Sequence, residues 1–94
     1  MKPFRWNAAK NEALKAGRGI SFEAVVVAIE AGRLLDIVAH PNPARYPRQR
    51  VLVVAAGGYV HLVPFVEEAG NHFFKTIIPS RKATRGYPTR GGDD

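Results

Sequence analysis

Residues 50–67 read RVLVVAAGGYVHLVPFVE, and this stretch decides the fold. Two apolar runs rich in β-branched side chains, residues 50–56 and 59–67, flank the dipeptide Gly57-Gly58. Glycine adopts the positive φ angles that a two-residue hairpin turn requires. The stretch therefore predicts two antiparallel strands. Pro64 cannot donate a backbone hydrogen bond, so it predicts an edge-facing position or a bulge in the second of them.

Further strands are predicted on both sides of this hairpin. Residues 34–40 and 72–78 are apolar and rich in β-branched and aromatic side chains, as strands are. A proline-rich loop over residues 41–49 separates the first of them from the hairpin. Residues 4–6, Phe-Arg-Trp, alternate apolar and polar side chains and predict a short edge strand. The result is an antiparallel meander of four strands, or five with the edge strand.

Two helices are predicted ahead of the meander. Asn7 is a good N-cap for a helix over about residues 8–16, and Gly19 follows it as a helix stop. Ser21 caps a second helix. Glu23 lies in the first turn of that helix, where the positive end of the helix dipole favours an acid. Apolar side chains recur in that helix at the spacing of one buried stripe. They are Phe22, Val25, Val26 and Ile29.

Near the end of the chain, Ser80 caps a short helix over residues 81–85. Two helices on one face of an antiparallel sheet make a two-layer α+β domain. The 94 residues suit a single domain, 1–94, with an ordered core over about 3–87 and a flexible tail over 88–94.

Composition excludes several classes of protein. The chain has no cysteine, which excludes a disulfide scaffold and a thiolate zinc site. Its three histidines lack the spacing of metal ligands, so no metal or other cofactor is predicted. The longest uncharged apolar stretch, residues 51–65, is too short to span a bilayer, and the N-terminus has no apolar signal core. We therefore expect a cytoplasmic protein without membrane contact.

Charge points toward a polyanionic partner. Fourteen Lys and Arg against eight Asp and Glu give a net charge of +6, which attracts polyanions. Two segments without any acid, residues 41–50 and 80–90, hold half of the basic residues and two tyrosines. Guanidinium groups match phosphate oxygens, and aromatic rings stack on unpaired bases, so this pattern favours RNA. A solvated loop or a partner-binding rim is the alternative for each segment.

RNA cleavage without a metal needs few groups, because the ribose 2′-OH is an internal nucleophile. A base, an acid and cations for the charged phosphate complete the requirement. The candidate catalytic residues are His61, Lys75 and Arg81. Alternation along a strand puts residues 59, 61, 63 and 65 on one face, and residues 73, 75 and 77 on one face. If His61 and Lys75 open onto the uncovered face near Arg50 and Arg81, they form a phosphate site.

Each candidate has a simpler interpretation. His61 lies between two apolar residues, as a half-buried strand histidine with a satisfied hydrogen bond does. Lys75 fits a solvent-facing strand position. The adjacent acids Glu67 and Glu68 point to opposite faces of a strand, which argues against the paired carboxylates of a metal-dependent nuclease.

Three short blocks of the sequence, and the order in which they occur, resemble those of a known family. They are residues 4–11, FRWNAAKN; residues 19–24, GISFEA; and residues 76–84, TIIPSRKAT. The chain resembles the BrnT-type toxins, small ribonucleases of bacterial type II toxin–antitoxin systems, over about residues 4–87. The resemblance implies a RelE-like α+β fold and RNA cleavage that blocks translation. It also implies neutralisation by a cognate ribbon-helix-helix antitoxin, which alone binds the operator DNA, and phosphate contacts at Lys10 and Arg81.

Three functions follow from these observations. The first is the ribonuclease toxin. Its candidate RNA-binding residues are Lys10, Arg45, Tyr46, Arg48, Arg50, Lys82 and Arg85. The second is a non-catalytic RNA-binding module, because no convincing acid–base pair is evident. The third is a protein-interaction subunit without nuclease activity, which pairs with another chain through an apolar edge over residues 63–66.

Overall fold

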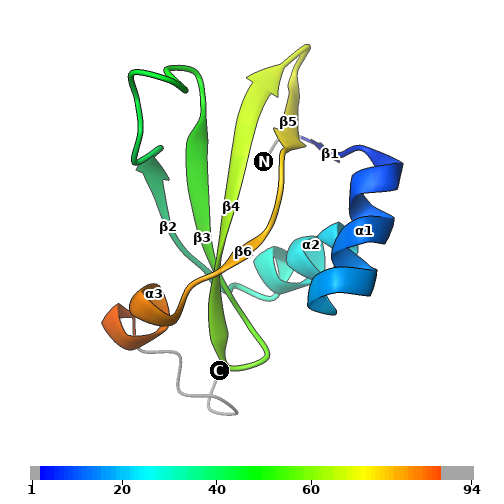
Figure 1. The fold of residues 1–94 in the computed structure, drawn as a ribbon, viewed down its shortest axis with the longest axis vertical. Coiled ribbons are helices and arrows are strands. Elements are labelled where there is room, and N and C mark those ends of the chain that lie inside the picture. Colours follow the sequence, from blue (N-terminus) through cyan, green and yellow to red (C-terminus); the bar gives the residue numbers. More distant parts are fainter. Residues whose placement is uncertain (1–2, 88–94) are drawn as a thin grey trace.

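The computed structural model describes residues 3–87 and contains three helices and six strands within that range (Figure 1). In chain order they are β1 (Phe4–Arg5), α1 (Ala8–Arg18), α2 (Phe22–Glu30), β2 (Leu34–Ala39), β3 (Arg50–Ala56), β4 (Tyr59–Glu68), β5 (Asn71–Phe74), β6 (Ile78–Pro79) and α3 (Arg81–Gly86). Two N-terminal helices, a sheet and a short C-terminal helix confirm the predicted α+β fold. The tail predicted over 88–94 lies outside the described residues. None of the three helices described is long and apolar enough to cross a membrane.

Both predicted N-caps of the N-terminal helices are present. Asn7 Oδ1 accepts the backbone N–H of Lys10 at 2.9 Å, and Ser21 Oγ accepts that of Ala24 at 3.1 Å. Each cap satisfies a donor that has no partner inside its helix. α1 extends two residues further than predicted and ends at Gly19, whose φ of 68° is in the left-handed region that favours glycine.

A buried amide joins the two helices. Asn11, with 3% of its surface exposed, accepts the backbone N–H of Phe22 at 2.8 Å and donates to Glu23 Oε1 at 2.7 Å. The hydrogen bond from Asn11 is the main reason that the pKa of the Glu23 carboxyl is lowered. Because Asn11 satisfies a free donor in the first turn of α2, it fixes how α1 meets α2.

The strand order is β1-β5-β4-β3-β2, with β6 beside β4. β1 pairs parallel with β5, so the sheet is mixed, whereas the sequence predicted an antiparallel meander. β4 lies in the middle of the sheet, between β3 and the β5–β6 segment. The expectation that residues 63–66 form an edge of the sheet is therefore wrong. β3 pairs with one side of β4 there, and on the other side β5 pairs with Phe65 and Val66 and the Pro64 carbonyl accepts the N–H of Lys75.

Pairing between β3 and β4 is continuous from Arg50↔Phe65 to Ala56↔Tyr59. Gly57 and Gly58 connect the two strands with φ angles of 63° and 76°, as the sequence predicted. Side chains that are paired across the strands share a face, so the two faces of the sheet can be assigned.

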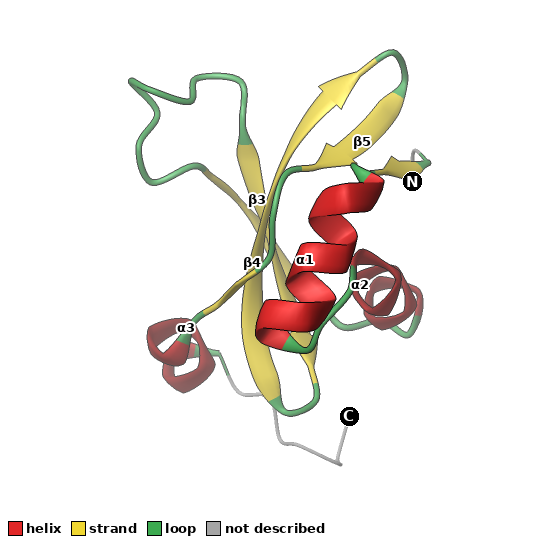
Figure 2. Cartoon of the chain, turned by 45° about the vertical axis from the view of Figure 1, so that its right-hand side comes forward, coloured by secondary structure: helices red, strands yellow, loops and turns green. Residues whose placement is uncertain are grey.

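We call the face under α1 and α2 the helix face (Figure 2). Its buried side chains form one core with those of the two helices. The sheet contributes Leu52, Val54, Val63, Phe65, Phe74 and Ile77, and the helices contribute Leu14, Phe22, Val25 and Ala28. Trp6 is a core anchor, since its ring lies 5.6 Å from that of Phe22 and 6.1 Å from that of Phe74. The other face, which carries Val51, Val53 and Ala55, we call the opposite face.

The strand predicted over residues 72–78 is broken in two, and Pro64 explains the break. The Pro64 carbonyl accepts the backbone N–H of Lys75 at 2.8 Å, but its nitrogen has no hydrogen to return the bond. Pairing of β4 with β5 ends at Phe74, and pairing with β6 resumes at Ile78, shifted by one residue. The extra residue reverses the alternation. Ile77 therefore packs in the core and does not share a face with Lys75, contrary to the sequence prediction.

α3 lies on the opposite face, at the lower end of the sheet in Figure 1. Thr84 Oγ1 accepts the backbone N–H of Val60 at 2.8 Å, and the Tyr87 hydroxyl donates to Asp36 Oδ2 at 3.1 Å. Since Asp36 is paired with Val53, its side chain is on the opposite face. The segment 80–87 therefore contacts both β4 and β2, and it crosses the opposite face between these two strands.

β2 forms one edge of the sheet, and its outer side is exposed. Leu35, Ile37 and Val38 each have 36% of their surface exposed there. Asp36 Oδ1 accepts the backbone N–H of Ile37 at 2.8 Å. In an antiparallel pair, residues that are hydrogen-bonded to the partner strand alternate with residues whose N–H points outward. Ile37 is a residue of β2 whose N–H points outward, away from β3.

Candidate nucleic-acid interface

The proline-rich loop between β2 and β3 is built around Asn42. Its side-chain oxygen accepts the N–H of Arg45 at 3.3 Å, and its carbonyl accepts the N–H of Tyr46 at 3.0 Å. Its own N–H donates to Nδ1 of His40 at 3.0 Å. A second turn follows, in which the N–H of Gln49 donates to the Tyr46 carbonyl at 3.2 Å. Such side-chain and turn bonds hold a loop in one shape without help from the sheet.

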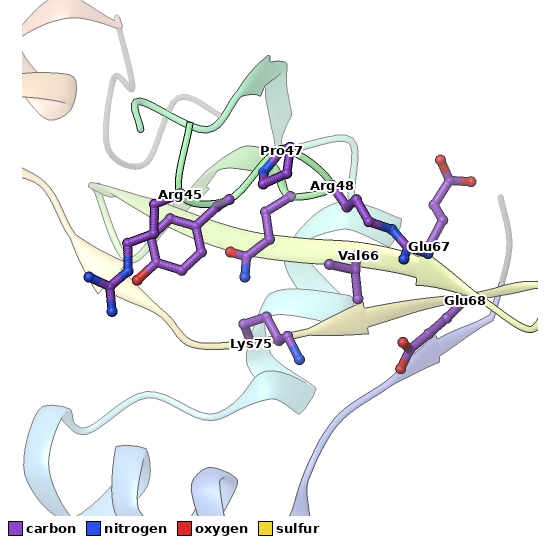
Figure 3. Close-up of a pocket in the computed structure, with 9 residues that line it drawn as sticks. Arg45, Pro47, Arg48, Val66, Glu67, Glu68 and Lys75 are labelled. Carbon is purple, nitrogen blue, oxygen red and sulfur yellow. The ribbon is translucent and has the colours of Figure 1, made fainter. Parts of the chain in front are cut away.

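A hollow of about 320 Å³ lies between this loop and the paired strands β4 and β5 (Figure 3). Nine described residues line it: Arg45, Tyr46, Pro47, Arg48, Gln49, Val66, Glu67, Glu68 and Lys75. Val66 pairs with Phe73, and Lys75 follows the buried Phe74, so Val66 and Lys75 both belong to the opposite face. Four of the candidate site residues, from segments about thirty positions apart in the sequence, therefore meet here. They are Arg45, Tyr46, Arg48 and Lys75.

Two cations of the hollow, Arg45 and Lys75, contact aromatic rings. The guanidinium carbon of Arg45 lies 5.4 Å from the centre of the Tyr46 ring, and the centre of the His40 ring lies 4.5 Å from the centre of the Tyr46 ring. The ammonium of Lys75 lies 5.1 Å from the centre of the Phe73 ring. Cations attract the negative faces of aromatic rings at these distances, so both side chains lose some of their freedom before any ligand binds.

The two acids of the hollow point to different sides of β4, as the sequence predicted. In Figure 3 the Glu67 carboxylate lies on one side of the ribbon, and the Glu68 carboxylate lies on the other side, together with the Lys75 ammonium. Glu67 pairs with Arg50, with an N–O distance of 3.8 Å. Glu68 and Lys75 therefore bring one carboxylate and one ammonium to the same face.

Arg50 does not join this group. It is paired with Phe65 on the helix face, and its guanidinium carbon lies 5.9 Å from the centre of the Phe65 ring. The prediction that Arg50 opens onto the uncovered face beside Lys75 is wrong, because alternation along β3 places Arg50 on the helix face. Lys10 is exposed on α1, on the helix side of the sheet, and is also separate from the hollow.

His61 is paired with Val54 and faces the helix side. Only 8% of its surface is exposed, and its Nδ1 has no hydrogen-bond partner among the described residues. Burial lowers the pKa of His61, so the ring is neutral at pH 7. The expectation that His61 and Lys75 open onto one face is therefore wrong. The structure supports the alternative of a buried strand histidine, although the predicted satisfied hydrogen bond is missing at Nδ1.

The remaining candidate cations are on α3. Ser80 Oγ accepts the N–H of Ala83 at 3.0 Å, which confirms Ser80 as the predicted cap of this helix. Arg81, Lys82 and Arg85 are all exposed. The opposite face thus carries two groups of cations, the hollow and α3, and neither contains His61.

Among residues 3–87, no three His, Cys, Asp or Glu side chains form a group that could hold a metal ion. Comparison with protein-family models, with curated proteins and with solved structures finds no match to this chain.

Sequence reasoning did not select five of the nine residues that line the hollow, and three of the five had a signal in the sequence. The five are Pro47, Gln49, Val66, Glu67 and Glu68. Gln49 stands between Arg48 and Arg50 in a segment already identified as basic. Val66 and Glu68 share the alternation of β4, which places them on one face. What the sequence lacked was the pairing of β4 with β5, which brings Lys75 beside them.

Proposed function

We propose that this protein is the toxin of a bacterial type II toxin–antitoxin pair, a metal-independent endoribonuclease that binds RNA on the opposite face and blocks translation. One observation carries the proposal. Six cations from three separate segments lie on that face, while the helix face supplies the apolar core. They are Arg45, Arg48, Lys75, Arg81, Lys82 and Arg85. Polyanions bind where such charges gather.

The hollow holds groups that suit cleavage through the 2′-OH of ribose. In the proposed step, the Glu68 carboxylate takes the proton of the 2′-OH, and the 2′ oxygen attacks the adjacent phosphorus. The bond from phosphorus to the 5′ oxygen breaks, and the leaving oxygen receives a proton from the Lys75 ammonium. Arg48 stabilises the charge that grows on the phosphate. The products are a 2′,3′-cyclic phosphate and a 5′-hydroxyl, and water carries the proton from Glu68 back to Lys75.

A test of cleavage uses the purified protein, single-stranded RNA and excess EDTA. We expect cyclic-phosphate ends, and no cleavage of the same strand with 2′-O-methyl ribose. Glu68→Gln should slow cleavage by about 100-fold or more, the range of a lost general base, while RNA affinity is kept. Glu67→Gln is the matched control, because its carboxylate points to the other side of β4. Equal loss in both variants, or activity that EDTA abolishes, would refute this chemistry.

The biological part of the proposal comes from the motif blocks that resemble BrnT-type toxins. It includes a cytoplasmic location, neutralisation by a ribbon-helix-helix antitoxin, and operator DNA bound only through that antitoxin. Induced expression should arrest growth, and Arg81→Ala should relieve the arrest, with Lys15→Ala on the exposed side of α1 as the control. Normal growth and intact RNA under induction of the wild-type chain would refute the toxin function.

A non-catalytic RNA-binding module is the second candidate. It is favoured by the position of His61, the group with the best ordinary pKa for proton transfer, which is buried on the helix face away from the cations. RNA that binds with a steep salt dependence but is recovered intact would support this candidate against the first.

A further inference from the structure

The two groups of cations lie at separate places along β4. The hollow meets β4 at Val66, and α3 is tied to β4 at Val60 by the Thr84 hydrogen bond. These two positions are six residues apart in one strand. At about 3.3 Å per residue, the separation is roughly 20 Å. One phosphate cannot reach both groups.

Between them, the opposite face is apolar. Ile78 is paired with Leu62, which in turn is paired with Val53, so all three side chains are on this face. Ile78 has 41% of its surface exposed, and Leu62 is half-buried. Ile78 is thus a large apolar side chain that the core does not use, flanked along β4 by cations on both sides.

We infer that a single-stranded RNA segment of about six nucleotides lies along β4 across the opposite face, with its phosphates on the hollow and on α3 and an unpaired base against Ile78. This inference rests on the RNA binding of the proposed function and adds its footprint and strandedness. About six nucleotides span roughly 20 Å at 3.4 Å per nucleotide. A duplex hides its bases, so it has nothing to place against Ile78, whereas a single strand does.

The first test measures binding of oligouridylates of three, six and twelve nucleotides by fluorescence anisotropy at several salt concentrations. The full chain is used with 2′-O-methyl strands that cannot be cleaved. Affinity should rise steeply from three to six nucleotides and little beyond. For the six-nucleotide strand, Arg48→Gln and Arg81→Gln should each lower the slope of log affinity against log salt by about 0.7, which is one phosphate contact. Lys15→Gln should leave the slope unchanged.

The second test removes the apolar contact. Ile78→Ala should weaken binding of the six-nucleotide strand by roughly threefold or more, because apolar surface that RNA covers is lost. Val27→Ala is the matched control, since Val27 is also an exposed apolar side chain (65%) but is on α2. Thermal unfolding of both variants shows whether either change acts through stability.

The outcomes separate the two proposals. If no strand binds at any length, the proposed function fails. If RNA binds and Arg48→Gln weakens it, but Arg81→Gln and Ile78→Ala have no effect at any length, the footprint is wrong and the proposed function stands. Binding of duplex RNA as tightly as single strands of equal length would also overturn the footprint.

Discussion

The two faces of the sheet differ in almost every physical property. On the helix face, aromatic and aliphatic side chains from five elements exclude water, and Phe22, Val54, Val63 and Ile77 have no exposed surface at all. On the opposite face, loops and a six-residue helix leave cations and a hollow open to solvent. The difference indicates that the helix face contributes the main core, whereas the opposite face, although it also buries Val51, Val53 and Val60, keeps its cations open to solvent. Four substitutions test this division, from the largest expected effect on stability to the smallest.

Phe74→Ala should be the most damaging. The Phe74 ring lies 5.0 Å from that of Phe4 and 5.7 Å from that of Phe22, and only 1% of the residue is exposed. Its truncation should lower the free energy of unfolding by about 3–5 kcal/mol, as measured by urea denaturation. The control is Phe73→Ala, one residue earlier and on the opposite face, where the loss should be clearly smaller. Equal losses would contradict a single core on the helix face.

Asn11→Ala should come next. The substitution leaves the N–H of Phe22 without a partner in a buried position and removes the hydrogen bond to Glu23. A buried unsatisfied donor costs about 1–3 kcal/mol, so the free energy of unfolding should fall by that amount. Asn71→Ala, which loses only an exposed side-chain bond, is the control. Affinity for RNA at a temperature where the variant is folded should not change.

Thr84→Val removes the hydroxyl that ties α3 to Val60 on the opposite face. The loss of this partly buried hydrogen bond should cost about 1 kcal/mol in unfolding free energy. Thr84→Ser keeps the hydroxyl and should retain most of the stability. If α3 carries part of the RNA footprint, Thr84→Val should also weaken binding of the six-nucleotide strand, whereas a stability loss with unchanged binding would separate the two roles.

His61→Phe tests the one titratable group that, among residues 3–87, is buried beside the apolar side chains of the helix face. Since burial lowers the pKa of His61 in the folded state, the unfolded state binds a proton more readily. Wild-type stability is therefore full above the unfolded pKa of about 6.5 and decreases as the pH falls toward the folded pKa. His61→Phe should flatten this decrease in urea unfolding between pH 7.5 and 5. An unchanged pH dependence would show that His61 is not the group responsible.

Local signals in the sequence were enough to predict most of the fold. The caps Asn7 and Ser21, the strand over residues 50–56 and the Gly57-Gly58 turn depend only on nearby residues, and all are present. The break after Phe74 was not predicted, because its cause, Pro64, lies in another strand and acts through a missing donor across the pair. The sequence predicted an edge-facing position or a bulge at Pro64, but it did not indicate that the extra residue would lie between Phe74 and Ile78.

The candidate site was predicted only in part, because part of the information again lies outside the local sequence. Composition identified the basic loop and the basic helix, and both are on one side of the sheet. Alternation along β4 correctly grouped His61 with Val63, but it did not say which face the helices cover. His61 and Arg50 were therefore placed on the wrong side, whereas Lys75, on the other alternation, was placed correctly. Alternation shows which residues share a face, but only the packing of the helices on the sheet shows which of the two faces is covered.

Asp36 has a consequence for how copies of this protein behave at high concentration. The outer edge of β2 is an apolar strand edge, the kind of surface on which sheets grow from one molecule to the next. The carboxylate of Asp36 occupies the outward N–H of Ile37, so a neighbouring strand meets a donor that is already taken and a negative charge beside it. Together with a net charge of +6, which makes copies repel each other, this bond should disfavour pairing of β2 with a strand of another copy.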